Sequence, residues 1–237
     1  MKKPPLIPSI VALFFVVLMT NLGLWQLQRA QEKEVLLELL ADDQMTQVVE
    51  ADQIKDLPQY ANVTLSGRFL SSPQLLLDNQ VNNKRIGFHV FTPFLIEGLN
   101  TYIMVNRGWV PKAGSENLDF DIESSQVDIL GKLNHSPQVG IQLGEIELDN
   151  NESPQLMTYY DREKVSSFLY ENLCGSLNCI VSNRVLLLEK DQSQGFERNW
   201  NPIVMLPEKH IGYAVQWFLM TLVLIIIFIY WVSKQED

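Results

Sequence analysis

Two long uncharged runs lie near the ends of the 237-residue chain. Residues 6–28 and residues 211–233 contain no Asp, Glu, Lys or Arg, whereas the stretch between them is polar. A helix needs about 20 mainly apolar residues to cross the hydrocarbon core of a bilayer. The pattern therefore predicts transmembrane helices at residues 6–28 and 211–232, and it excludes a purely soluble protein and a transporter with many spans.

The first run predicts a retained anchor. Lys2 and Lys3 supply the positive start of a signal peptide, but the apolar run is too long and residues 27–30, Leu-Gln-Arg-Ala, are a poor cleavage context. Two spans place both tails, residues 1–5 and 233–237, on one side of the membrane. Because the short lysine-bearing tail favours the cytoplasm, we expect a multi-pass protein of the cell inner membrane with a periplasmic middle.

The predicted middle, residues 29–210, mainly shows the period of β-strands. Between Ala61 and Phe69 apolar and polar residues alternate, as in a half-buried strand. The helical exception is residues 160–173. Short strands with about one helix predict a mainly antiparallel barrel or sandwich, so the expected fold class is membrane-anchored α+β. Further segments of strand length are residues 75–78, 87–96, 101–110, 126–133, 139–148 and 180–189.

Three other segments connect these elements. Residues 34–40 continue the first helix with an apolar face. Residues 98–100, Gly-Leu-Asn, lie between two predicted strands and are typical of a hairpin loop. Residues 191–207 mix Gln, Ser, Gly, Asn and two prolines, and they therefore predict a linker that returns the chain to the membrane.

The formal net charge is −10, and the acidity is concentrated in the middle. Residues 29–210 hold 15 of the 18 basic and 26 of the 28 acidic residues, which gives this stretch a net charge of −11. Such a balance argues against nucleic acid and against an anionic lipid surface as partners, because both repel negative charge. The acidity most simply indicates solubility.

Motifs of catalytic or nucleotide-binding sites are missing from the sequence, which has no phosphate loop, nucleophile elbow or dinucleotide fingerprint. The three histidines, His89, His135 and His210, lie far apart. His89 alternates with apolar neighbours in a predicted strand and His135 lies in a predicted turn, so we expect both to face solvent. We do not expect an enzyme.

Cys174 and Cys179 are separated by four residues. A loop of this length closes readily with a disulfide in an oxidising compartment. The alternative is a thiol pair that handles copper or a redox partner, although the two-residue gap of such motifs is missing. A structural disulfide or two inert thiols is the favoured interpretation, and the pairing stays open.

The most specific strings lie at the two spans and in the strands between them. In their order along the chain they resemble the signatures of the Surfeit locus protein 1 family, the cytochrome c oxidase assembly factors, over nearly the whole chain. The strings are LGLWQLQRAQEK at residues 22–33, GRF at 67–69, DNQ at 78–80, GFHV at 87–90, TPF at 92–94, VNRGWVP at 105–111, NP at 201–202 and HIGYAVQWF at 210–218.

This resemblance implies a non-catalytic role in the maturation of haem-copper oxidase. The implied partners are cytochrome c oxidase subunit I and proteins of haem synthesis or assembly, together with membrane lipid. The implied cofactor is haem a, held transiently. The implied ligand of the haem iron is the histidine that opens the second span, which is His210 in this chain.

Helical spacing adds candidate neighbours of His210. Tyr213, Ala214 and Trp217 follow it at three, four and seven residues, so all four share one face of the second helix. We expect a porphyrin to lie against this face. The resulting candidate cofactor-binding residues on this helix are His210, Tyr213 and Trp217.

The first helix supplies the candidates for an opposite wall. Gly23 permits close helix approach, Trp25 lies at the interfacial end, and Arg29 has the charge to pair with a haem propionate. The simpler interpretation also stays open, in which Trp25 and Trp217 are interfacial anchors and Arg29 reaches toward the headgroups.

Other interpretations of the function stay open as well. The main alternative is a membrane scaffold that stabilises an oxidase intermediate without binding haem, and a third is a periplasmic enzyme with an unrecognised site. Arg107 either locks a turn or faces the oxidase, whereas we favour a structural role for Trp109.

Overall fold

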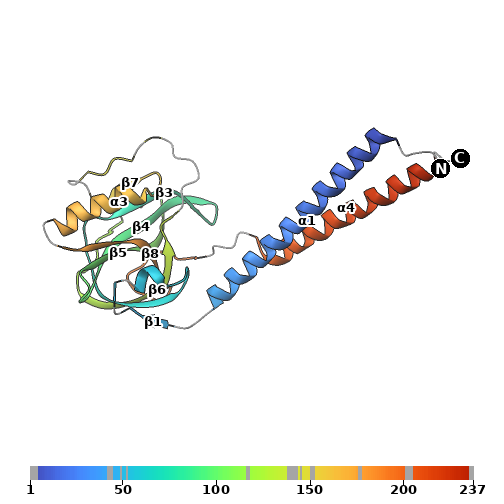
Figure 1. Cartoon of the computed structure of the whole chain (residues 1–237). Helices are drawn as coiled ribbons and strands as arrows, with labels where there is room; N and C mark the ends of the chain where they lie inside the picture. Colours follow the sequence, from blue (N-terminus) through green and yellow to red (C-terminus); the bar gives the residue numbers. More distant parts are fainter. Residues whose placement is uncertain are drawn as a thin grey trace. The chain divides into compact units, whose positions relative to one another are not determined.

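The chain forms two compact units in the computed structural model (Figure 1). The β unit comprises residues 42–200, and the helix unit comprises residues 1–41 and 201–237. The β unit is shorter than the predicted middle, because residues 29–41 continue the first helix. The structure describes residues 5–41, 45–48, 50–51, 53–115, 118–137, 144, 146–149, 153–175, 178–200 and 205–234.

The helix unit consists of α1 (Leu6–Ala41) and α4 (Pro207–Lys234), which run side by side. The first turn of α1 and the last turn of α4 lie at the same end of the pair (Figure 1). Both helices are long and apolar enough to cross a membrane. Most of their apolar side chains point outward, as helices that face lipid require.

The β unit is a barrel. The strands form one sheet in the order β1-β2-β6-β8-β5-β4-β3-β7, and a further pairing between β2 and β4 closes the ring. Most pairings are antiparallel, as predicted, whereas β1–β2, β3–β7 and β5–β8 are parallel. The strands are β1 (Met45–Gln47), β2 (Asn62–Phe69), β3 (Leu75–Asn82), β4 (Arg85–Ile96), β5 (Thr101–Pro111), β6 (Gln126–His135), β7 (Gln155–Met157) and β8 (Ile180–Leu188).

Alternating side chains fill the barrel. In β2, Val63, Leu65 and Phe69 are fully buried, and Thr64, Ser66 and Arg68 are more exposed. Phe69 and Phe94 meet edge to face with ring centroids 5.0 Å apart. The period of two in the sequence therefore reflects a real inner face.

The strands differ from the prediction at two places. β3 continues past residue 78, because Asn83 and Lys84, both with positive φ, make a two-residue turn into β4. In the predicted strand at residues 139–148, residues 139–143 and 145 lie outside the described residues, and residues 146–148 form no strand. The pattern also misses β1, β7 and the short helix α2 (Gln53–Asp56), since three or four residues carry too little periodicity.

The predicted helix at residues 160–173 is confirmed as α3 (Arg162–Leu169) followed by one π-helical turn, η2 (Tyr170–Cys174). Asp161 caps α3, and its side chain accepts hydrogen bonds from two backbone N–H groups of the first turn. These bonds satisfy donors that a helix start leaves without partners.

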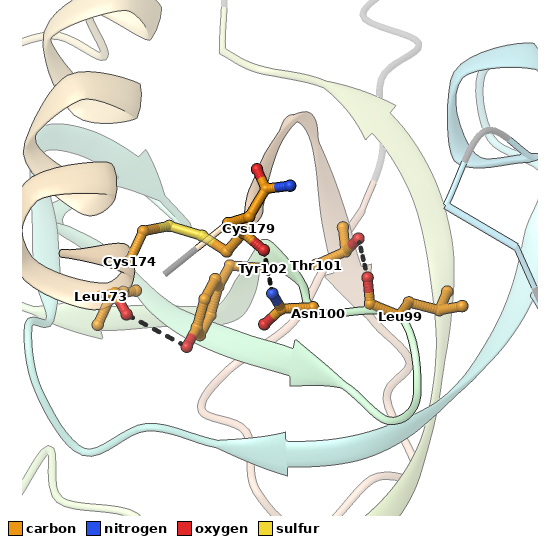
Figure 2. The surroundings of a disulfide bond; sticks show 8 residues. Leu99, Asn100, Thr101, Tyr102, Leu173, Cys174 and Cys179 are labelled. Carbon is orange, nitrogen blue, oxygen red and sulfur yellow. Dashed lines mark hydrogen bonds between the residues drawn. A yellow bond between two sulfur atoms is a disulfide. The ribbon is translucent and has the colours of Figure 1, made fainter. Parts of the chain in front are cut away.

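A disulfide joins Cys174 to Cys179 and connects the end of η2 to the start of β8 (Figure 2). Both cysteines are buried. Beside the bond, the Tyr102 hydroxyl donates to the carbonyl of Leu173 at 3.4 Å. The pair thus has the structural role that the sequence analysis favoured.

The predicted linker after β8 is bound to the barrel as far as residue 200. Trp109 and Glu197 exchange backbone hydrogen bonds of 2.7 and 3.2 Å, so the returning chain lies beside β5. The guanidinium of Arg198 donates to three backbone carbonyls of the same segment. Residues 201–204 of the predicted linker lie outside the described residues.

Candidate functional site

Small residues line the contact between α1 and α4. Gly23 and Ala30 are the buried residues of α1, and Pro207, Ala214 and Thr221 are those of α4. Within each helix these residues are seven apart, which keeps them on one face. Small side chains on facing helices let the two backbones approach closely, and such packing is a main source of helix association in a membrane.

Gly23 leaves room for the ring of Phe218. A Cβ atom at position 23 would lie 2.6 Å from this ring, which is closer than atoms can pack. Gly212 lies on a different face of α4, where a Cβ atom would meet nothing within 4 Å. The glycine in α1 is therefore required by the contact, and the one in α4 is not.

A hydrogen bond between the two helices orients His210. The Nδ1 atom of the imidazole lies 2.7 Å from Oε1 of Gln26. An amide oxygen only accepts, so Nδ1 is the donor of this bond, and in the neutral imidazole the lone pair is then on Nε2. No residue in the described part of the chain bonds to Nε2. Histidines that bind metals are commonly held in this way, through the ring nitrogen that does not face the metal.

Tyr213 and Trp217 follow His210 on α4 and stay accessible. Tyr213 is 43% exposed and Trp217 is half-buried. Ala214 is fully buried in the contact with α1, so the face expected to receive a porphyrin is covered at its centre. The accessible surface next to the imidazole is consequently formed by the two aromatic side chains.

Trp25 and Arg29 lie elsewhere on α1. A helix turns by about 100° per residue, so Trp25 lies about 160° around α1 from Gly23, which faces α4, and Arg29 lies about 120° from it. The Arg29 guanidinium pairs with Glu32 at 2.7 Å and lies 5.7 Å from the centre of the Trp25 ring. In the helix unit, the first helix therefore presents Gln26 to the imidazole, while Trp25 and Arg29 form an exposed pair.

Arg107 and Trp109 hold the barrel together. The Arg107 guanidinium donates to the carbonyls of Gln194 and Phe120 at 2.7 and 2.8 Å and lies 4.9 Å from the Phe196 ring. Burial lowers the pKa of Arg107 to about 10, so it remains charged at neutral pH. Trp109 is 2% exposed. Both residues therefore bind neighbouring segments to β5, and neither presents a surface to a partner.

The expectation that His89 faces solvent holds only in part, because the side chain is half-buried. The Nδ1 atom of its ring lies 3.3 Å from the side-chain nitrogen of Asn106, and its ring meets Trp200 edge to face at 5.7 Å. Burial lowers the pKa of His89 to about 4, so the imidazole is neutral at pH 7. Trp200 comes from a segment more than 100 residues away, which strand alternation does not foresee. His135 is exposed, as expected.

The donor set at His210 suits a cofactor that brings most of its own ligands. Among the residues that the structure describes, no three His, Cys, Asp or Glu side chains gather around a common point. A haem supplies four nitrogen ligands itself and takes one or two axial ligands from the protein. The Nε2 atom of His210 has the chemistry of such an axial ligand.

Sequence reasoning did not assign a site role to Gln26 or Phe218. Gln26 carried a usable signal, because an amide side chain inside an uncharged span is costly unless it has a partner. Phe218 carried none, because one aromatic residue among many in a span is not distinctive.

Comparison with known proteins covers nearly the whole chain. Residues 13–222 match the model of the SURF1 family. A SURF1-like protein of Rickettsia felis is 24% identical over 228 residues, which are 93% of this chain and 95% of that protein. A second, from Rickettsia prowazekii, is 22% identical over 90% of this chain and 84% of its own length. Surfeit locus protein 1 of Xenopus tropicalis is 25% identical over 84% of this chain and 67% of its own length.

Proposed function

Because the chain belongs to the SURF1 family, we propose that it is a membrane-bound assembly factor for haem-copper oxidase and not an enzyme. In this proposal the protein binds haem a transiently at the membrane interface and assists its insertion into subunit I. His210 is the axial ligand of the haem iron. The partners are the oxidase subunit and the proteins that make or deliver the haem.

The observation that carries the proposal is the hydrogen bond from His210 to Gln26. It orients the imidazole through Nδ1, so that in the neutral ring Nε2 is the nitrogen left for a metal, and it does so where the second span begins. Bound haem would supply an iron atom that accepts this nitrogen as an axial ligand. A single protein ligand also suits a carrier, since the cofactor has to leave again.

The aromatic residues near the imidazole have a defined part in the proposal. Tyr213 and Trp217 offer apolar ring faces beside His210, whereas Trp25 lies on the far side of α1 and takes no part in the proposal. Arg29 pairs with a haem propionate in place of Glu32. This exchange costs little, because exposed ion pairs contribute at most about 1 kcal/mol.

The proposed location is the cell inner membrane, with both tails in the cytoplasm and the β unit in the periplasm. The two apolar helices and the lysine-bearing N-terminal tail support this orientation.

A scaffold without haem is the second candidate function, and the same hydrogen bond supports it. A bond between polar groups of two spans stabilises their association by about 0.6 kcal/mol on average. In that case His210 and Gln26 fix the helix pair, and the β unit holds an oxidase intermediate.

Complementation of a strain that lacks the gene separates the two functions. We expect the wild-type chain and His135→Ala to restore oxidase with its full haem a content, and His210→Ala to restore subunits that lack haem. His135 is the matched control because it is exposed. Full haem content in the His210→Ala strain would contradict the carrier and favour the scaffold.

A further inference from the structure

The β3–β4 hairpin ends in a small apolar tip, residues 81–86. Val81 and Ile86 are cross-strand partners and are 69% and 56% exposed. Val81 is the most exposed large apolar residue among those described in the β unit. Burial stops before the tip, because β3 is buried from Leu75 to Asp78 and exposed or half-exposed beyond that point. The tip thus places two neighbouring aliphatic side chains outside the barrel core.

The charge at the tip is opposite to that of the rest of the β unit. Residues 42–200 contain 12 basic and 22 acidic residues, a net charge of −10, yet residues 79–96 contain no Asp or Glu. Lys84 and Arg85 lie at the turn itself. Arg85 pairs with Glu197 at 3.3 Å, and Lys84 has no ion pair in the described part of the chain. The tip therefore combines apolar and cationic groups.

The turn retains a lysine where glycine is the common residue. Asn83 and Lys84 have φ angles of 48° and 63°, which is the pattern of a two-residue turn whose second position usually holds glycine. A side chain in this left-handed region strains the backbone. Lys84 thus keeps its charge at the outermost point of the hairpin at some cost to the turn.

The hairpin is tied to the segment that leads toward α4. The side chain of Glu197 accepts from Asn82 at 2.7 Å, from Asn83 at 3.3 Å and from Arg85 at 3.3 Å. Glu197 lies ten residues before Pro207, where α4 begins. The tip is therefore hydrogen-bonded to a residue near the C-terminal end of the β unit.

We infer that residues 81–86 contact the anionic headgroup layer of the membrane that the chain crosses. Val81 and Ile86 enter the interface, and Lys84 pairs with lipid phosphates, as a cation beside apolar groups does at membrane surfaces. A stable protein interface buries about 800 Å² on each partner, far more than two side chains provide. The size of the tip therefore favours lipid over a protein partner.

This inference changes an expectation drawn from net charge. The acidic balance of the middle argued against anionic lipid as a partner for the whole stretch, whereas the structure separates one cationic tip from the acidic remainder. The contact does not depend on haem binding, so either proposal can fail alone.

The test uses the full chain reconstituted into vesicles. Because Cys174 and Cys179 are joined, a cysteine introduced by Val81→Cys is the reactive thiol for an environment-sensitive fluorophore. We expect lipids brominated on the acyl chain to quench this probe several-fold more than a probe at Leu156→Cys. Leu156 is a matched control, because it is 55% exposed and lies in β7, where it pairs with Leu76 in the buried first half of β3.

A second variant separates the contact from misfolding. Lys84→Gly relaxes the turn and removes the charge, so we expect it to raise the unfolding temperature while reducing the quenching at Val81→Cys in vesicles that contain phosphatidylglycerol. Equal quenching at positions 81 and 156 would overturn the inference. If the probe at position 81 is shielded only when purified oxidase is added, the inference is likewise overturned. Equal quenching in neutral and anionic vesicles would overturn the assignment to anionic headgroups.

Discussion

His210 is bound by Gln26 through Nδ1, and no described residue bonds to its Nε2. His89 shows a different use of the same side chain, since its half-buried ring contacts Asn106 and Trp200 and stays neutral at pH 7. The sequence distinguishes the two only by their neighbours along the chain. The partners that decide their chemistry come from distant segments, and no local pattern predicts them.

The Gln26–His210 bond predicts an effect on haem binding. We expect Gln26→Leu to lower haem affinity about 10-fold, because removal of an outer partner of a metal ligand usually costs 10- to 100-fold. Gln28→Leu is the control, since Gln28 is exposed and bonds only to Glu32 among the described residues. Equal affinity of both variants, measured by haem titration of the purified protein, would show that Gln26 does not position the ligand.

The half-buried imidazole of His89 predicts a dependence of stability on pH. Its pKa is lowered to about 4 in the folded state, so between pH 6.5 and pH 4 the unfolded chain binds a proton that the folded chain does not. The free energy of unfolding therefore falls as the pH drops through this window, by up to about 3 kcal/mol, and the loss is complete below pH 4. Urea unfolding of the wild type and of His89→Gln at pH 7 and pH 4.5 measures this, and an identical loss in both proteins would contradict it.

At the scale of elements, the sequence predicted elements that have a regular pattern of apolar residues. It did not predict which elements contact one another. The alternation of Val63, Leu65 and Phe69 with polar residues locates β2 to within one residue. By contrast, residues 191–200 have the composition of a linker, yet hydrogen bonds to β5 hold them against the barrel. Composition reports how polar a segment is, and it does not report which backbone groups the segment meets.

The contact between α1 and α4 predicts which glycine tolerates a side chain. We expect Gly23→Leu to lower the stability of the helix unit by about 1–3 kcal/mol, because the new side chain would overlap the Phe218 ring. Gly212→Leu should change it little, since that position faces open space. Thermal unfolding in detergent compares the two variants, and the addition of Phe218→Ala should recover part of the loss at position 23. Equal effects at both glycines would contradict the packing.

At the scale of the whole molecule, the two units differ in the residues that they contribute. The β unit supplies most of the charge and the bound segments around β5, and the helix unit carries His210 with its partner. The sequence predicted both spans and the barrel class, because each has a local pattern, whereas the role of His210 stays a prediction that rests on a family string. It did not predict that Ala214 is buried or that Arg29 pairs with Glu32 beside Trp25 on the exposed side of α1, since both depend on which helix face meets the other helix.

The absorbance spectrum of the protein purified from a host that makes haem a tests the central proposal most directly. We predict haem absorbance for the wild type and for His135→Ala, and its loss for His210→Ala, with all three proteins equally folded. Haem absorbance of unchanged position and intensity in His210→Ala would contradict the assignment of His210 as the axial ligand.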